Sequence, residues 1–140
     1  DEMLDFSKAV TYGAQTEEDW HFEHKAKQHR ALMDSYVVID RVFEEFEKKT
    51  GRKYRRLESY MMDDAEVAIV ALGATVETCI LAAKELREQE GLKAGVVAPR
   101  SIRPFPFNEI REVLANVKAV AALDHSVSMG AMGMLYNEIA

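Results

Sequence analysis

The sequence predicts an α/β domain in which a largely parallel sheet is covered by helices on both faces. Three short apolar runs, at 67–72, 94–98 and 119–123, alternate with segments of helical periodicity. Each run has the length of a buried strand and ends in residues that favour a turn. This alternation is typical of βαβ crossovers. Such a sheet is usually an enzyme scaffold, yet the residues around it supply no recognisable catalytic machinery.

Residues 16–49 carry the first helical pattern, after a segment without sustained periodicity. The acidic residues that follow Thr16 suit the positive end of a helix dipole, and Gly51 is a favourable stop. Within 53–60 we expect a strand, although the apolar alternation there is imperfect. Apolar side chains at spacings of three or four define one face of the first helix: Leu32, Tyr36, Ile39, Val42, Phe43 and Phe46.

Two further helices are predicted between the three apolar runs. The first follows a tight turn at Gly73, with Thr75 as its N-cap and Gly91 just past its end. Its predicted buried stripe is Val76, Cys79, Ile80, Ala83 and Leu86. The second follows Pro104 and Pro106, since proline suits a first helical turn. Its buried face is predicted to be Phe107, Ile110, Leu114 and Val117.

Bulk properties indicate one globular domain of 140 residues with an ordinary apolar content of 48%. A net charge of −6 argues against a general nucleic-acid binder. No run approaches the ~18 apolar residues of a membrane span, so no membrane partner is expected. Cys79 is the single cysteine, and a reducing, cytoplasmic setting is the default. The sequence begins without Met and stops inside a helical pattern, so we expect a longer parent polypeptide.

Two segments could bind a ligand, but for each of them we favour a structural or surface role. His21, Glu23, His24 and His29 could bind a metal, but their spacing matches no zinc-protease pattern, so a polar or interdomain surface is preferred. The turn 73–75 could cradle a phosphate at a helix N-terminus. It lacks the glycine spacing of a dinucleotide or Walker loop, so a tight turn is preferred.

The third apolar run leads into further candidates. Asp124, His125 and Ser126 have the residue types of a hydrolytic triad, but consecutive residues rarely converge, and interface or turn-capping roles are favoured. Gly130 and Gly133 permit close approach of the backbone to a ligand or to a packing neighbour, and packing is preferred. The methionines at 129, 132 and 134 most simply pack in the core. A basic cluster could meet a phosphorylated cofactor or an acidic partner, with a solvated face favoured: Lys48, Lys49, Arg52, Lys53, Arg55 and Arg56.

Several of these segments together resemble a known family. Residues 63–75, residues 100–106, and residues 120–124 followed by Gly130 and Gly133 look like the domain that follows the pyrimidine-binding domain in 2-oxoacid:ferredoxin oxidoreductases. The upstream segments Tyr12-Gly13, Phe22-Glu23-His24-Lys25 and Gly51-Arg52-Lys53-Tyr54 are similar to the connecting segment of the pyruvate-specific members. The resemblance therefore covers nearly the whole chain.

The resemblance implies a three-layer α/β/α domain similar to the C-terminal domain of transketolase. Its mixed, mostly parallel sheet has five strands, the first antiparallel. That first strand would lie within 53–60, and the fifth would lie beyond Ala140. It also implies the division 1–52, a connecting segment whose long helix packs on the domain, and 53–140, the α/β domain.

The functional implication is a part of the alpha subunit of a pyruvate:ferredoxin oxidoreductase, or pyruvate synthase. Such enzymes make acetyl-CoA with thiamine diphosphate, Mg²⁺ and iron–sulfur clusters, and reduce ferredoxin or flavodoxin. Open alternatives are a 2-oxoisovalerate oxidoreductase, a dehydrogenase β subunit, a transketolase-like enzyme or a free-standing small-ligand module.

No residue of this chain is assigned to catalysis, to a cofactor or to a metal, and the chain alone is expected to be inactive. A single cysteine cannot build a cluster site, and no Gly-Asp-Gly diphosphate motif occurs. The expected partners are the other domains or subunits of the parent enzyme. Candidate interdomain contacts are Arg100, Arg103, Asp124 and His125, which follow predicted parallel strands at one sheet edge.

Overall fold

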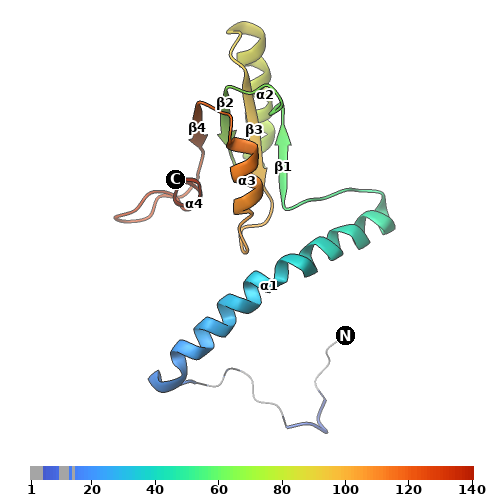
Figure 1. Ribbon diagram of the computed structural model, residues 1–140, viewed down its shortest axis with the longest axis vertical. Helices are drawn as coiled ribbons and strands as arrows, with labels where there is room; N and C mark the ends of the chain where they lie inside the picture. The colour runs from blue at the N-terminus through green and yellow to red at the C-terminus, as the bar shows by residue number, and fades with distance from the viewer. Residues whose placement is uncertain (1–4, 10–12, 14) are drawn as a thin grey trace.

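The chain forms an open four-stranded sheet with helices on both faces and one long helix beside it, as a computed structural model shows (Figure 1). The structure describes residues 5–9, 13 and 15–140. Tyr12, part of the upstream resemblance, lies outside them. The α/β class is confirmed. In chain order the elements are α1 (Glu18–Thr50), β1 (Leu57–Tyr60), β2 (Val67–Val70), α2 (Thr75–Gln89), β3 (Ala94–Pro99), α3 (Phe107–Leu114), β4 (Ala119–Ala122) and α4 (Met134–Ile139).

The strand order is β1-β3-β2-β4, with β2 parallel to both of its neighbours and β1 antiparallel to β3. The strand expected within 53–60 is therefore present, in the direction that the resemblance implies. Every residue of β3 is buried, because this strand has neighbours on both sides and helices over both faces. By contrast β4 is an edge strand and is mostly exposed.

Two apolar clusters, one on each face of the sheet, give the domain three layers. On one face Val70 and Val97 pack with Ile110 of α3 and Leu135 of α4. On the other face the side chains of α2 meet Ala71, Ala94 and Val96: Cys79 and Ala83 are buried there, with Val76, Ile80 and Leu86 packed alongside. The stripe predicted for α2 is thus its sheet-facing side.

Two helix starts differ from the sequence prediction. The N-cap of α2 is Ala74, and Thr75 is already helical, so the capping role assigned to Thr75 is wrong. Likewise α1 begins after Glu17 rather than after Thr16, without a side-chain cap. The predicted stop of α1 is confirmed, because Gly51 adopts φ of 72° and donates its N–H to the Glu47 carbonyl.

Helix α1 lies beside the domain (Figure 1) and contacts it through side chains of its C-terminal half. The Tyr36 hydroxyl donates to the Phe105 carbonyl, and Leu32, Ile39 and Phe43 are half-buried. Val42, predicted on the same face, is exposed because the helix has no second neighbour among the described residues. Residues 18–31 are exposed throughout. In the part of the chain that the structure describes, no helix has the length and apolar character required to cross a membrane.

Candidate functional site at the carboxyl edge of the sheet

Asp124, just after β4, uses its carboxylate to organise the loop that leads into α4. One oxygen, Oδ1, accepts hydrogen bonds from the Ser126 backbone N–H at 3.0 Å and from the Ser126 hydroxyl at 2.8 Å. The other, Oδ2, accepts the Leu135 backbone N–H of the first turn of α4 at 2.6 Å. The Leu135 bond first, and then the Ser126 bonds, hold the pKa of Asp124 below its usual value. Asp124 therefore supplies the cap that α4 lacks locally.

Gly133 makes this arrangement sterically possible. A Cβ at this position would lie 2.7 Å from Asp124 Oδ2 and 2.7 Å from the Ser126 carbonyl oxygen. The glycine thus serves close packing of the loop, which agrees with the preferred sequence interpretation.

His125 follows Asp124 in the chain, but its side chain reaches the start of α2. Its Nε2 and the Thr75 hydroxyl are 2.8 Å apart and share a hydrogen bond. This bond joins the segments that follow β2 and β4, and it gives Thr75 a role other than helix capping. The relay order of a hydrolytic triad is not formed among these residues, since Asp124 bonds Ser126 while the His125 ring bonds Thr75.

Arg100, at the end of β3, is held by groups of this chain. Its Nη2 lies 2.5 Å from Glu58 Oε1, and its guanidinium lies over the Tyr54 ring at 4.5 Å. Partial burial alone would raise the pKa of Glu58, but hydrogen bonds from Tyr60 and Arg100 outweigh burial and lower that pKa. Arg100 also lines a shallow pocket of about 380 Å³ that includes Gly73 and Glu77.

Arg103 connects the segment after β3 to α4. Its Nη1 donates to the Ile102 carbonyl at 2.7 Å, and its Nη2 donates to the Glu138 carboxylate. Half of the Arg103 side chain remains exposed. The four candidate residues are therefore held by different elements: Asp124 and Arg103 both bond α4, His125 bonds Thr75 of α2, and Arg100 bonds Glu58 of β1. Each has a partner within the chain.

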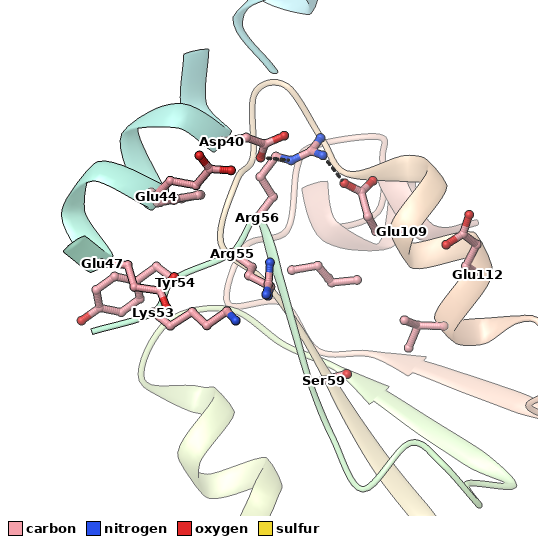
Figure 2. A pocket seen from close by; sticks show the side chains of 13 residues that line it. Asp40, Glu44, Glu47, Lys53, Tyr54, Arg55, Arg56, Ser59, Glu109 and Glu112 are labelled. Carbon is pink, nitrogen blue, oxygen red and sulfur yellow. Dashed lines mark ion pairs between the residues drawn. The ribbon is translucent and has the colours of Figure 1, made fainter. Parts of the chain in front are cut away.

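Sequence reasoning missed a charged cluster that lies between α1 and α3 (Figure 2). Arg56 pairs with Asp40 of α1 at 3.0 Å and with Glu109 of α3 at 2.6 Å. Its guanidinium lies 4.4 Å above the Tyr36 ring. Burial and then Glu109 raise the pKa of Tyr36, although Arg56 opposes them. The only sequence signal was the basic cluster, which contains Arg56 but does not reveal its partners.

Arg56 lies at one side of an open pocket of about 690 Å³ (Figure 2). Lys53 and Arg55 line this pocket together with the carboxylates Glu44, Glu47 and Glu112. Side chains of both signs line the pocket, so the residues of the basic cluster that reach it do not form a uniformly positive site for an anion.

The histidine cluster and the methionines have different outcomes. His21, His24 and His29 are exposed on α1, and within 5–9, 13 and 15–140 no three His, Cys, Asp or Glu side chains are grouped to hold a metal ion. Met129, Met132 and Met134 are exposed, so the core-packing prediction for them is wrong. The loop between β4 and α4, which carries Met129 and Met132, projects from the sheet edge (Figure 1).

These features define an open α/β domain with an antiparallel first strand and a sheet edge whose polar groups bond one another. Residues 65–140 match the family described as pyruvate:ferredoxin oxidoreductase core domain II, and the chain belongs to that family. The resemblance drawn from sequence is confirmed.

Curated relatives extend the similarity to nearly the whole chain. It is 41% identical to pyruvate synthase subunit PorA of Thermotoga maritima, over 98% of this chain and 35% of that protein. It is 34% identical to pyruvate synthase subunit PorA of Methanothermobacter thermautotrophicus, over 99% and 36%. It is 33% identical to ketoisovalerate oxidoreductase subunit VorA of Pyrococcus abyssi, over 97% and 34%. The chain thus spans about a third of the length of these relatives.

Proposed function

We propose that this chain is a structural and interface domain, with its connecting segment, of the alpha subunit of a pyruvate:ferredoxin oxidoreductase. The parent enzyme would convert pyruvate and CoA to acetyl-CoA and CO₂ and pass the electrons to ferredoxin or flavodoxin, in the cytoplasm. The observation that carries the proposal is the 41% identity to a PorA subunit across 98% of the chain. Residues 1–52 then connect to a preceding domain, and residues 53–140 form the α/β unit.

The residues of this chain do not fit the cofactors of such an enzyme. Iron–sulfur clusters are held by several thiolates, whereas Cys79 is single and buried, and burial raises the pKa of its thiol. Binding Mg²⁺ with a diphosphate takes converging oxygen ligands, and the described residues offer no such group of carboxylates. We therefore assign thiamine diphosphate, Mg²⁺ and the clusters to other parts of the parent enzyme.

The chemistry of the sheet edge supports a structural role. Asp124 accepts two backbone N–H groups, Arg100 pairs with Glu58, and Arg103 pairs with Glu138. Groups held in this way stabilise loops, and their exposed sides remain able to contact a neighbouring domain. We propose Arg100, Arg103, Asp124 and His125 as interdomain contacts on this basis.

A second candidate substrate is 2-oxoisovalerate. The similarity to VorA subunits, at 33% identity over 97% of the chain, favours it independently of the PorA matches. Comparing kcat/KM of the intact enzyme for pyruvate and for 2-oxoisovalerate decides between the two substrates.

The structural role is tested by Arg103→Ala in the intact enzyme. We expect a lower melting temperature or weaker subunit assembly, with kcat for pyruvate unchanged at saturating substrate and cofactors, because the Glu138 contact holds α4 and not the reacting atoms. Arg111→Ala is the matched control, since Arg111 is exposed on α3 and makes only a 3.5 Å contact with Asn108. Normal assembly of Arg103→Ala with lost turnover would overturn the structural role.

A further inference from the structure

The loop between β4 and α4 has a firmly held base. Asp124 bonds both Ser126 and Leu135 across the loop, and Gly133 packs directly against Asp124. The bond between His125 and Thr75 fixes one side of the base to α2. Because these contacts fix both ends of the loop, the residues between them project from a defined position on the domain.

Residues 127–132, which we call the apolar tip, form a compact turn. Ser128 and Ala131 make an antiparallel bridge, with the Ala131 N–H donating to the Ser128 carbonyl at 3.2 Å. Gly130 permits the reversal by adopting φ of 76°. At this tip Met129 is fully exposed, Val127 is 89% exposed and Met132 is 62% exposed.

The apolar tip is also without charge. From Ser126 to Asn137 the sequence contains no Asp, Glu, Lys, Arg or His, in a chain that is 30% charged. Solvated loops usually carry polar residues, so three neighbouring apolar side chains that are each more than half exposed indicate a surface that is covered in the working protein. Methionine suits such a contact because its flexible thioether adapts to an irregular partner surface.

We propose that the apolar tip is a docking element that inserts into an uncharged, apolar hollow on another domain of the same longer polypeptide. The proposal rests on the proposed function and names the partner of the sheet edge. Relatives of this chain are about three times its length, so most of such a polypeptide lies outside the 140 residues and is available to form the hollow. A charged partner is disfavoured, because the tip would desolvate its charges without pairing them.

The firm base makes docking favourable. A loop that is already ordered loses little conformational entropy on binding, so the burial of Val127 and Met129 translates more fully into affinity. Met129 is the most exposed side chain of the tip, so we expect it to contribute most of the binding energy. Ser128 and the glycines shape the turn that presents it.

Photo-cross-linking in the intact, anaerobically purified enzyme tests the proposal. Benzoylphenylalanine replaces Met129 in one variant and Leu81, an exposed residue of α2, in the control. We expect the Met129 position to cross-link to a peptide of the same polypeptide outside the 140 residues, without a gain in mass on a denaturing gel, and Leu81 to give no such product. Cross-links to a second copy or to a different subunit, or no cross-link, would overturn the proposal.

A substitution gives a second, independent readout. Met129→Glu places a charge in the docked interface, so the intact enzyme should melt at a lower temperature, whereas Leu81→Glu should melt like the wild type. Equal melting of both variants and the wild type would contradict docking. Pyruvate-dependent ferredoxin reduction by the wild type is measured in parallel. Absence of that activity would count against the proposed function, whereas the cross-linking result would still test docking of the apolar tip.

Discussion

The sequence neighbours of Asp124 suggest a catalytic role, whereas its neighbours in space give it a structural role. Consecutive Asp, His and Ser residues have the composition of a triad, yet the Asp124 carboxylate accepts hydrogen bonds from Ser126 in its own loop and from the Leu135 N–H in the first turn of α4. A carboxylate that accepts several such bonds favours its ionised form. Its contribution is therefore to stability and depends on pH.

Replacing Asp124 by Asn tests that contribution. The pKa of Asp124 is lowered on folding, so its stabilisation is fully present above the unfolded value near 3.8 and is lost as pH falls through the folded value. We expect Asp124→Asn to be less stable than the wild type in urea melts at about pH 6, and this difference to shrink toward about pH 2. Asp34→Asn, on the exposed side of α1, should match the wild type at both pH values. A difference that is independent of pH would contradict the assignment.

At the scale of elements, the sequence predicts those parts that are determined locally. Of the three parallel strands, β2 and β4 lie within the predicted apolar runs and β3 continues just past its run, to Pro99, because each run is bounded by turn residues. The extent of β1 was uncertain from sequence, since its position depends on pairing with β3, where Leu57 faces Pro99. Burial of the methionines was predicted wrongly, because apolar composition alone does not distinguish a core residue from one displayed on a projecting loop.

Helix α2 offers adjacent residues with opposite environments. Ile80 packs on the sheet, whereas Leu81 is 66% exposed on the outer side. Ile80→Ala should lower the free energy of unfolding by about 2 kcal/mol, the lower end of the range for a core residue because Ile80 is only partly buried. Leu81→Ala should change it by less than about 0.5 kcal/mol in the same denaturant melts. Equal losses at the two positions would mean that α2 is rotated about its axis.

For the whole molecule, the relation between α1 and the sheet domain is the part that sequence could not supply. Arg56 joins Asp40 and the Tyr36 ring, one turn apart on α1, to Glu109 on α3, and these residues belong to no shared sequence motif. The basic cluster around Arg56 suggested a solvated face or a site for an external anion. Instead Arg56 is the most buried of the paired basic side chains and fixes a helix that has no fully buried residue of its own.

Arg56→Ala should loosen α1 from the domain while leaving the sheet intact. Loss of the two charged hydrogen-bonded contacts should cost about 1–3 kcal/mol of docking free energy, so the amides of residues 32–46 should exchange roughly 5- to 150-fold faster. In Arg56→Lys the amide exchange rates of α1 should lie between those of the wild type and of Arg56→Ala. An ammonium keeps the charge but cannot bridge both carboxylates with a planar fork. Arg41→Ala removes only an exposed pair with Glu45 at 4.0 Å and should have almost no effect.

Hydrogen exchange followed by mass spectrometry reports α1 and β3 in one experiment. Unchanged exchange in α1 of the Arg56→Ala protein would mean that the apolar contacts of Leu32, Ile39 and Phe43 hold the helix without this arginine.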